Sequence, residues 1–174
     1  MPVFGGTNEQ GSATVYRHEI RPHYNWTSLS WNSPREKAAA SQPLELQRGF
    51  NMEKSGEGNT FLIIFIRVKY VGTQAMHAPL AKQFVVNSDG KICNYSPVHS
   101  SDVLREEVSG TQYDNQIGLG RTMGGTLWDI PPSESNLVDG YLIYEIPASL
   151  FSPGTTCVVS NLDYMNQAVW NPGC

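Results

Sequence analysis

The chain has 174 residues, a length that suits one domain with a substantial hydrophobic core and is short for two. Only 16% of the residues are charged and the net charge is −4, so the basic surface of a nucleic-acid-binding protein is not expected. The longest apolar run, residues 61–66, has the length of a strand and is too short for a membrane span. Abundant Gly, Pro, Asn, Ser and Thr indicate a turn-rich β protein without a transmembrane segment.

Residues 1–12 have the composition of a flexible lead, and we expect a single domain over residues 13–174. Residues 13–33 are rich in β-branched and aromatic residues and contain Pro22, which cannot donate a hydrogen bond to a strand ladder. We therefore expect one strand on each side of this proline, at a sheet edge or at a bend. In the polar segment 34–59, the piece "SPREKAAASQ" favours a helix of a turn or two.

The clearest strand covers residues 60–71, "TFLIIFIRVKYV". Its even-numbered residues form one continuous apolar face. The opposite face begins with large apolar residues and ends with Arg67 and Lys69. A strand that is apolar on both faces at one end is typical of the centre of a sandwich, from which its polar end emerges.

Further strands follow at short intervals. Asp89-Gly90, between two extended runs, predicts a tight hairpin. The segment 97–123 favours a loop with a weak strand around Thr111–Tyr113. Residues 137–147 alternate, so we expect the even-numbered side chains to face the core and Pro147 to end the strand. Residues 155–162 and 167–170 complete a set that predicts an all-β, immunoglobulin-like Greek-key sandwich of about seven to nine strands.

Three segments occur in a recognisable order: "GNTFLIIFIRVKYVGTQ", "APLAKQFVVNSDGKICNYSP" and "TLWDIPPSESNLVDGYLIYEIP". Together they resemble the secreted and lipid-anchored prokaryotic immunoglobulin-like domain of unknown function, whose sandwich a mycobacterial secreted antigen shares. The matching motifs are Ser88-Asp89-Gly90-Lys91 with Tyr95, the turn Pro132-Ser133-Glu134-Ser135, and the strand end Glu145-Ile146-Pro147. In the turn, Ser133 replaces the usual glycine. The resemblance covers about residues 58–163.

The resemblance implies an extracellular or cell-surface protein, with a signal peptide or lipid anchor that is absent from this chain. It transfers no catalytic residue, no metal ligand and no cofactor-binding residue. We therefore expect no cofactor, an unknown protein or envelope partner, and a monomer or weak homo-oligomer. The sequons at Asn25 and Asn94 are possible glycosylation sites, although Pro97 follows the second.

Three cysteines are present, Cys93, Cys157 and Cys174. If the last two strands form a hairpin centred on Met165-Asn166, Cys157 and Cys174 lie opposite each other, within reach of a disulfide. The bridge would contribute about 3 kcal/mol in the chain-entropy model. Cys93–Cys157, Cys93–Cys174 and three free thiols are the alternatives.

Function has three competing interpretations. The first is a non-enzymatic module that acts by protein binding or surface assembly, with Trp26 and Trp31 as a possible binding surface against the alternative of core packing. The second is a structural envelope component that assembles by edge-strand pairing. The third is a hydrolase that uses His99 or the 97–125 loop, but neighbouring Ser, His and Asp in one loop do not normally converge as a triad.

Overall fold

Most of the residues that the structure describes lie in β-strands. The computed structural model describes residues 3–5, 10–27, 43, 50–70, 76–77, 79–88, 90–94, 105–106, 113, 129–130, 137–151, 156–161 and 167–171. The strands are β1 (Val3–Gly5), β2 (Gln10–Arg21), β3 (His23–Thr27), β4 (Phe50–Lys54), β5 (Asn59–Tyr70), β6 (Met76–His77), β7 (Phe84–Ser88), β8 (Lys91–Asn94), β9 (Arg105–Glu106), β10 (Asp129–Ile130), β11 (Leu137–Pro147), β12 (Thr156–Asn161) and β13 (Gln167–Trp170). The described residues also include two 3-10 turns, η2 (Ala81–Gln83) and η4 (Ala148–Leu150). The all-β prediction is confirmed.

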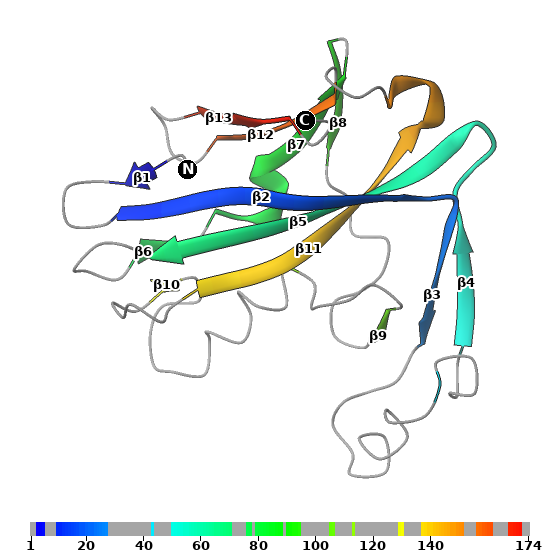
Figure 1. Ribbon diagram of the computed structural model, residues 1–174, viewed down its shortest axis with the longest axis horizontal. Coiled ribbons are helices and arrows are strands. Elements are labelled where there is room, and N and C mark those ends of the chain that lie inside the picture. The colour runs from blue at the N-terminus through cyan, green and yellow to red at the C-terminus, as the bar shows by residue number, and fades with distance from the viewer. Residues whose placement is uncertain are drawn as a thin grey trace.

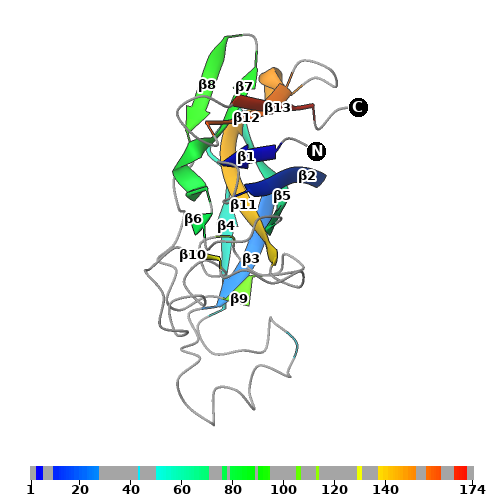
Figure 2. The ribbon, with the colours of Figure 1, turned by 90° about the vertical axis from the view of Figure 1, so that its left-hand side faces the viewer.

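The described strands form antiparallel sheets (Figure 1). The long sheet has the order β1-β2-β5-β11, and the short sheet has the order β13-β12-β7-β8. Two smaller sheets have the orders β4-β3-β9 and β10-β6. Both views place the short sheet on one side of the long sheet, above it as drawn (Figures 1 and 2). None of the described residues forms a helix that is long and apolar enough to span a membrane.

β11 pairs with β5 along its full length, from Leu137 opposite Lys69 to Pro147 opposite Asn59. This unbroken register preserves the alternation in both strands, so the even-numbered residues of each share one face. The predicted core face of β11 is confirmed, and Pro147 ends the strand as expected.

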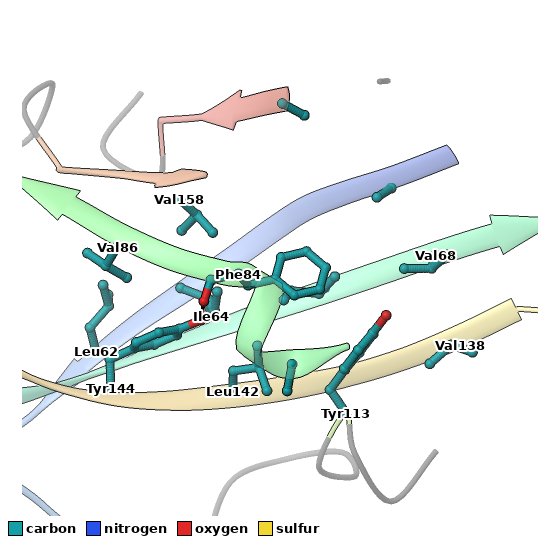
Figure 3. Close-up of a cluster of buried hydrophobic side chains, with 14 of the residues drawn as sticks. Leu62, Ile64, Val68, Phe84, Val86, Tyr113, Val138, Leu142, Tyr144 and Val158 are labelled. Atoms are coloured by element: carbon teal, nitrogen blue, oxygen red, sulfur yellow. Dashed lines mark hydrogen bonds between the residues drawn. The ribbon is translucent and has the colours of Figure 1, made fainter. Parts of the chain in front are cut away.

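Side chains from the long and the short sheets meet in one hydrophobic group, the inner cluster (Figure 3). Its members are Ala13, Leu62, Ile64, Ile66, Val68, Ala81, Phe84, Val86, Tyr113, Val138, Leu142, Tyr144, Ile146, Val158 and Ala168. The hydroxyl of Tyr144 on β11 donates to the carbonyl of Phe84 on β7 at 3.1 Å. The hydroxyl of Tyr113 donates to the carbonyl of Pro79 at 2.8 Å. The polar ends of both buried rings are therefore hydrogen-bonded.

The opposite face of the long sheet carries a second hydrophobic group, the outer cluster. Its members are Tyr24, Phe61, Ile63, Phe65, Tyr141 and Ile143, and Trp26 packs against them. Further along β5 on the same face, Arg67 and Lys69 are exposed. The prediction that this strand is apolar on both faces at one end and amphipathic at the other is confirmed.

The chain leaves the long sheet at Pro22, which separates β2 from β3 as predicted. The carbonyl of Pro22 accepts hydrogen bonds from the backbone N–H and the hydroxyl of Ser55, both at 3.1 Å. These bonds join the bend to the turn between β4 and β5. Gly58 in that turn has φ +76°, a conformation that glycine adopts without strain. Beyond this bend and turn, β3 and β4 pair with each other at an angle to the long sheet (Figure 1).

The predicted hairpin at Asp89-Gly90 joins β7 and β8, with Ser88 opposite Lys91 and with φ +80° at Gly90.

Two expectations differ from the structure. Residues 3–5 and 10–12 are strand instead of flexible lead, because β1 pairs with the start of β2. Tyr113 has a helical backbone, so the weak strand predicted there does not include it. The predicted short helix after Ser33 and the turn Pro132-Ser133-Glu134-Ser135 lie outside the described residues.

Candidate functional site

A β-bulge in β2 places two adjacent side chains on the outer face of the long sheet. Val15 pairs with Ile66 and Arg17 pairs with Phe65, so Tyr16 is an extra residue without a cross-strand partner on β5. A regular strand would send Tyr16 and Arg17 to opposite faces. Here both contact Phe65: the Tyr16 and Phe65 ring centroids lie 6.2 Å apart, and the Arg17 guanidinium lies 3.7 Å from the Phe65 centroid. Bulges of this kind often redirect side chains at functional sites.

Asp139 on β11 connects Tyr16 to Arg67. The Tyr16 hydroxyl donates to Asp139 Oδ1 at 2.7 Å. Arg67 donates to Oδ2 from Nε at 2.9 Å and from Nη2 at 2.6 Å. The Arg67 guanidinium also lies 4.8 Å from the centroid of the Tyr16 ring, within the range of a cation–π contact. One carboxylate therefore fixes the positions of both neighbours.

Arg17 is held mainly by its aromatic neighbour. Its Nη2 lies 3.4 Å from Glu19 Oε1, longer than a strong charge-assisted hydrogen bond. The other oxygen of Glu19 accepts a 2.6 Å hydrogen bond from Arg21 Nη2. The Phe65 ring orients the Arg17 guanidinium. Because the Arg17 side chain is 45% exposed, its N–H groups can still donate hydrogen bonds to a ligand.

The electrostatics of this network keep the Tyr16 phenol and the Arg67 guanidinium protonated. Partial burial raises the pKa of the Tyr16 phenol, and the hydrogen bond and the negative charge of Asp139 raise it further, against the opposing effect of Arg67 and Arg17. The hydrogen bond with Asp139 also raises the pKa of Arg67. Tyr16 is therefore protonated and Arg67 charged at neutral pH, so neither serves as a general base.

Apolar and basic groups extend the network. Leu137 on β11 pairs with Lys69 on β5, and Tyr16 and Leu137 are 45% and 46% exposed. We define the bulge surface as Tyr16, Arg17, Arg67, Lys69, Leu137 and Asp139. It combines aromatic and aliphatic contact area with oriented cations, an arrangement that suits binding.

Of the two tryptophans weighed as a possible binding surface, the structure describes only Trp26. Trp26 is half-buried and packs against the outer cluster, because β3 turns toward that cluster after Pro22. The structure thus supports core packing at this residue. Trp31 lies outside the described residues.

The two sequon asparagines differ in accessibility. Asn25 is half-buried in the middle of β3, opposite Met52, and Asn94 is exposed at the end of β8. Of the two, Asn94 has the more accessible side chain. Glycosylation at either position stays a prediction.

The register of the last hairpin differs from the one predicted. Asn161 pairs with Gln167, which centres the hairpin on residue 164 instead of between residues 165 and 166. Continuing this register places residue 171, and not Cys174, opposite Cys157. Cys174 lies outside the described residues, so the bridge itself stays a prediction.

Cys93 on β8 pairs with Val86, and Cys157 on β12 pairs with Asn87, so β7 separates the two cysteines. The strands that carry the two cysteines are two strand spacings apart, about 9–10 Å. A disulfide tolerates a Cα–Cα separation of at most about 7 Å. The alternative Cys93–Cys157 bridge is therefore wrong. Cys93 is a free, half-buried thiol that packs against the inner cluster.

His99 and the 97–125 loop, on which the hydrolase interpretation depends, lie outside the described residues. Among the described residues, no three His, Cys, Asp or Glu side chains gather in a way that could hold a metal ion. The described histidine His18 packs its ring against Phe151, with ring centroids 5.8 Å apart.

Sequence reasoning missed the bulge surface, although one signal was present. Ala13 and Val15 pack at the inner cluster and Ile20 pairs with Leu62 of the same cluster, so an odd step of five residues separates Val15 from Ile20. Such a break in period-two alternation indicates a bulge. No family model matches this chain, and no curated protein or solved structure is significantly similar to it.

Proposed function

We propose that this chain is a non-enzymatic, immunoglobulin-like module that acts outside the cytoplasm by binding a protein partner. The strand order supports the architectural part of the proposal. If β2, β5 and β11 are strands A, B and E, and β13, β12, β7 and β8 are strands G, F, C and C′, the orders in both large sheets are those of an immunoglobulin sandwich. The extracellular or cell-surface location is what the family resemblance implies.

The bulge surface carries the functional part of the proposal. Tyrosine and arginine are the residue types enriched among residues that dominate binding energy at protein interfaces. Asp139 holds Tyr16 and Arg67, and Phe65 supports Arg17, so these side chains lose little further conformational entropy when a partner binds. An oriented but exposed set of this kind favours recognition.

A comparative capture experiment tests the proposal. Immobilised wild-type protein and a Tyr16→Ala/Arg17→Ala variant would be incubated with a detergent extract of the producing cells. Lys82→Ala is the matched control, because Lys82 is exposed on η2 and lies outside the bulge surface. We expect a protein that the wild type and the control capture equally and the double variant captures at least tenfold less.

Folding of each variant would be checked by circular dichroism and thermal unfolding. Equal capture by the wild type and by the folded double variant, or the absence of any captured protein, would contradict binding through this surface.

Edge-strand pairing within an envelope assembly is the second candidate. β8 is the last strand of the short sheet, three of its four residues are exposed, and Ile92 is 61% exposed. Such an edge can accept another strand, although Lys91 disfavours it. Concentration-dependent sedimentation that Ile92→Pro abolishes would support this candidate over the first.

A further inference from the structure

The bulge surface is basic on an acidic protein. Arg17, Arg67 and Lys69 against Asp139 give it a net charge of 3 − 1 = +2, whereas the whole chain has a net charge of −4. The neighbouring Glu19 does not change this balance, because Arg21 pairs with it at 2.6 Å. A local potential that opposes the sign of the whole molecule selects for a partner segment of negative charge.

Two of the cations retain unused hydrogen-bond donors. Asp139 accepts from Arg67 and Tyr16 with both of its oxygens. Among the residues that the structure describes, Arg17 has one ionic contact, at 3.4 Å from Glu19, and Lys69 has none. A ligand therefore meets Arg17 and Lys69 as its ionic contacts.

The spacing of these cations defines the ligand further. Arg17 lies opposite Phe65, and Lys69 is four residues further along β5, which corresponds to about 13 Å along a strand. In an extended peptide, side chains four residues apart project to the same side at the same spacing of about 13 Å. Tyr16 and Leu137 supply exposed apolar area for the residues between them.

Building on the proposed function, we infer that the bulge surface binds an extended acidic segment of the partner protein. Two carboxylates about four residues apart would contact Arg17 and Lys69, and an apolar side chain between them would contact Tyr16 and Leu137. A polyanion such as a nucleic acid or a phosphate polymer fits less well. The net charge of −4 repels a long, highly charged chain more strongly than a short acidic segment, and a phosphate polymer has no apolar group to contact Tyr16 and Leu137.

Selection from random short peptides displayed on phage tests this inference with the intact chain as bait. We expect the enriched peptides to contain Asp or Glu pairs about four residues apart. For the best peptide, made synthetically, replacing its carboxylates by amides should weaken binding about tenfold or more, and added salt should weaken it as well.

Variants of the bait assign the contacts. Arg17→Gln and Lys69→Gln should each weaken binding of the acidic peptide about tenfold, Arg17→Lys should weaken it less, and the exposed control Lys82→Gln should leave it unchanged. Lack of acidic enrichment, or unchanged binding in both Arg17→Gln and Lys69→Gln, would overturn the inference. So would stronger competition by polyphosphate than by the acidic peptide, which would indicate a polyanion ligand.

The selection also separates this inference from the proposed function. Enriched peptides that lack carboxylates but lose binding with Tyr16→Ala would overturn the acidic ligand and leave a protein-binding surface in place. Peptides whose binding depends on none of Tyr16, Arg17, Lys69 and Leu137 would contradict both.

Discussion

The hydroxyl of Tyr16 on β2 donates a 2.7 Å hydrogen bond to Asp139 on β11, two strands away in the long sheet and 123 residues away in the sequence. β5 lies between them, and its Arg67 donates to the other carboxylate oxygen. Asp139 therefore joins three strands on the outer face. The bulge makes the bond possible, because it provides the extra residue whose side chain reaches over β5.

The Tyr16–Asp139 bond predicts an unusual phenol titration. Burial first, and then Asp139, raise the pKa of Tyr16, while Arg67 opposes them. We expect Asp139→Ala to lower this pKa and Arg67→Ala to raise it. Ring carbon shifts of labelled tyrosine, assigned with Tyr16→Phe, would measure both effects. An unchanged pKa in Asp139→Ala would show that the bond does not persist in solution.

The sign of the linked stability follows from the raised pKa. The folded protein binds the phenol proton more tightly than the unfolded chain, so the contribution to stability is complete below the pKa of an unfolded tyrosine. It is lost as the pH rises through the folded pKa. The difference in stability between wild type and Tyr16→Phe should therefore shrink at strongly alkaline pH.

β5 is buried on both faces, so substitutions on either face should destabilise the protein. In a sheet with one solvent-exposed face, only one of the two faces would be sensitive. Ile64 belongs to the inner cluster and Ile63 to the outer cluster, and both are 0% exposed. We expect Ile63→Ala and Ile64→Ala each to reduce the free energy of unfolding by about 2–4 kcal/mol, measured by urea denaturation. Lys69→Ala on the same strand is the exposed control. A near-neutral effect of Ile63→Ala would contradict a packed outer cluster.

The contact between Tyr144 and the carbonyl of Phe84 links the two large sheets inside the inner cluster. Tyr144→Phe keeps the ring and removes the donor, so we expect a loss of about 1 kcal/mol in unfolding free energy. The matched control is Tyr16→Phe, which removes a hydroxyl on the exposed face and should cost less near neutral pH. A loss near zero in Tyr144→Phe would indicate that the hydrogen bond of Tyr144 adds nothing to the burial of its ring.

Local sequence signals predicted the elements whose structure depends on neighbouring residues. β11 follows from alternation that ends at Pro147, and the β7–β8 hairpin follows from a residue pair, Asp89-Gly90, that suits a tight turn. The bulge at Tyr16 and the register of the last hairpin were not predicted. The break in alternation between Val15 and Ile20 signalled a bulge, but its exact place depends on pairing with β5, which lies far along the chain. The last hairpin is local, but its connecting segment contains no residue pair such as Asn-Gly or Asp-Gly that would fix the register.

The same limit applies to burial on the outer face. Tyr141 and Ile143 were assigned to the side of β11 away from the core, and both are buried there among the rings of Tyr24 and Phe61. Alternation in one strand shows which residues share a face, but the partner that covers that face comes from another part of the chain. The sequence predicted a break in the chain at Pro22, but not that the strand after it would bring Tyr24 to this cluster.

The turn between β4 and β5 depends on a glycine and on a carboxylate. Gly58 has φ +76°, so Gly58→Ala should lower the free energy of unfolding by about 1 kcal/mol. Gly58→Asn should lower it less, because asparagine tolerates this region better.

Glu145 Oε1 accepts hydrogen bonds from the Gly56 N–H at 2.7 Å and from Asn59 Nδ2 at 2.9 Å. Glu145→Ala should therefore accelerate hydrogen exchange of the Gly56 amide. Unchanged exchange there would show that Glu145 does not hold the turn.

The cysteines provide a test that joins fold and location. Protein purified without reductant would be labelled with an alkylating reagent after unfolding, and the labelled positions would be mapped by mass spectrometry. One labelled thiol, at Cys93, is the expected result if Cys157 and Cys174 are bridged. With residue 171 opposite Cys157 in the continued register, such a bridge requires the chain to turn back at Pro172-Gly173, a pair that favours turns.

Either outcome has a consequence for the proposed location. A bridge indicates folding in an oxidising compartment and therefore supports a secreted or surface-displayed protein. Three labelled thiols on a stably folded chain would contradict the bridge and leave the extracellular assignment resting on the family resemblance alone. Labelling of native protein adds a control for the fold, because Cys93 packs against the inner cluster and should react more slowly before unfolding than after it.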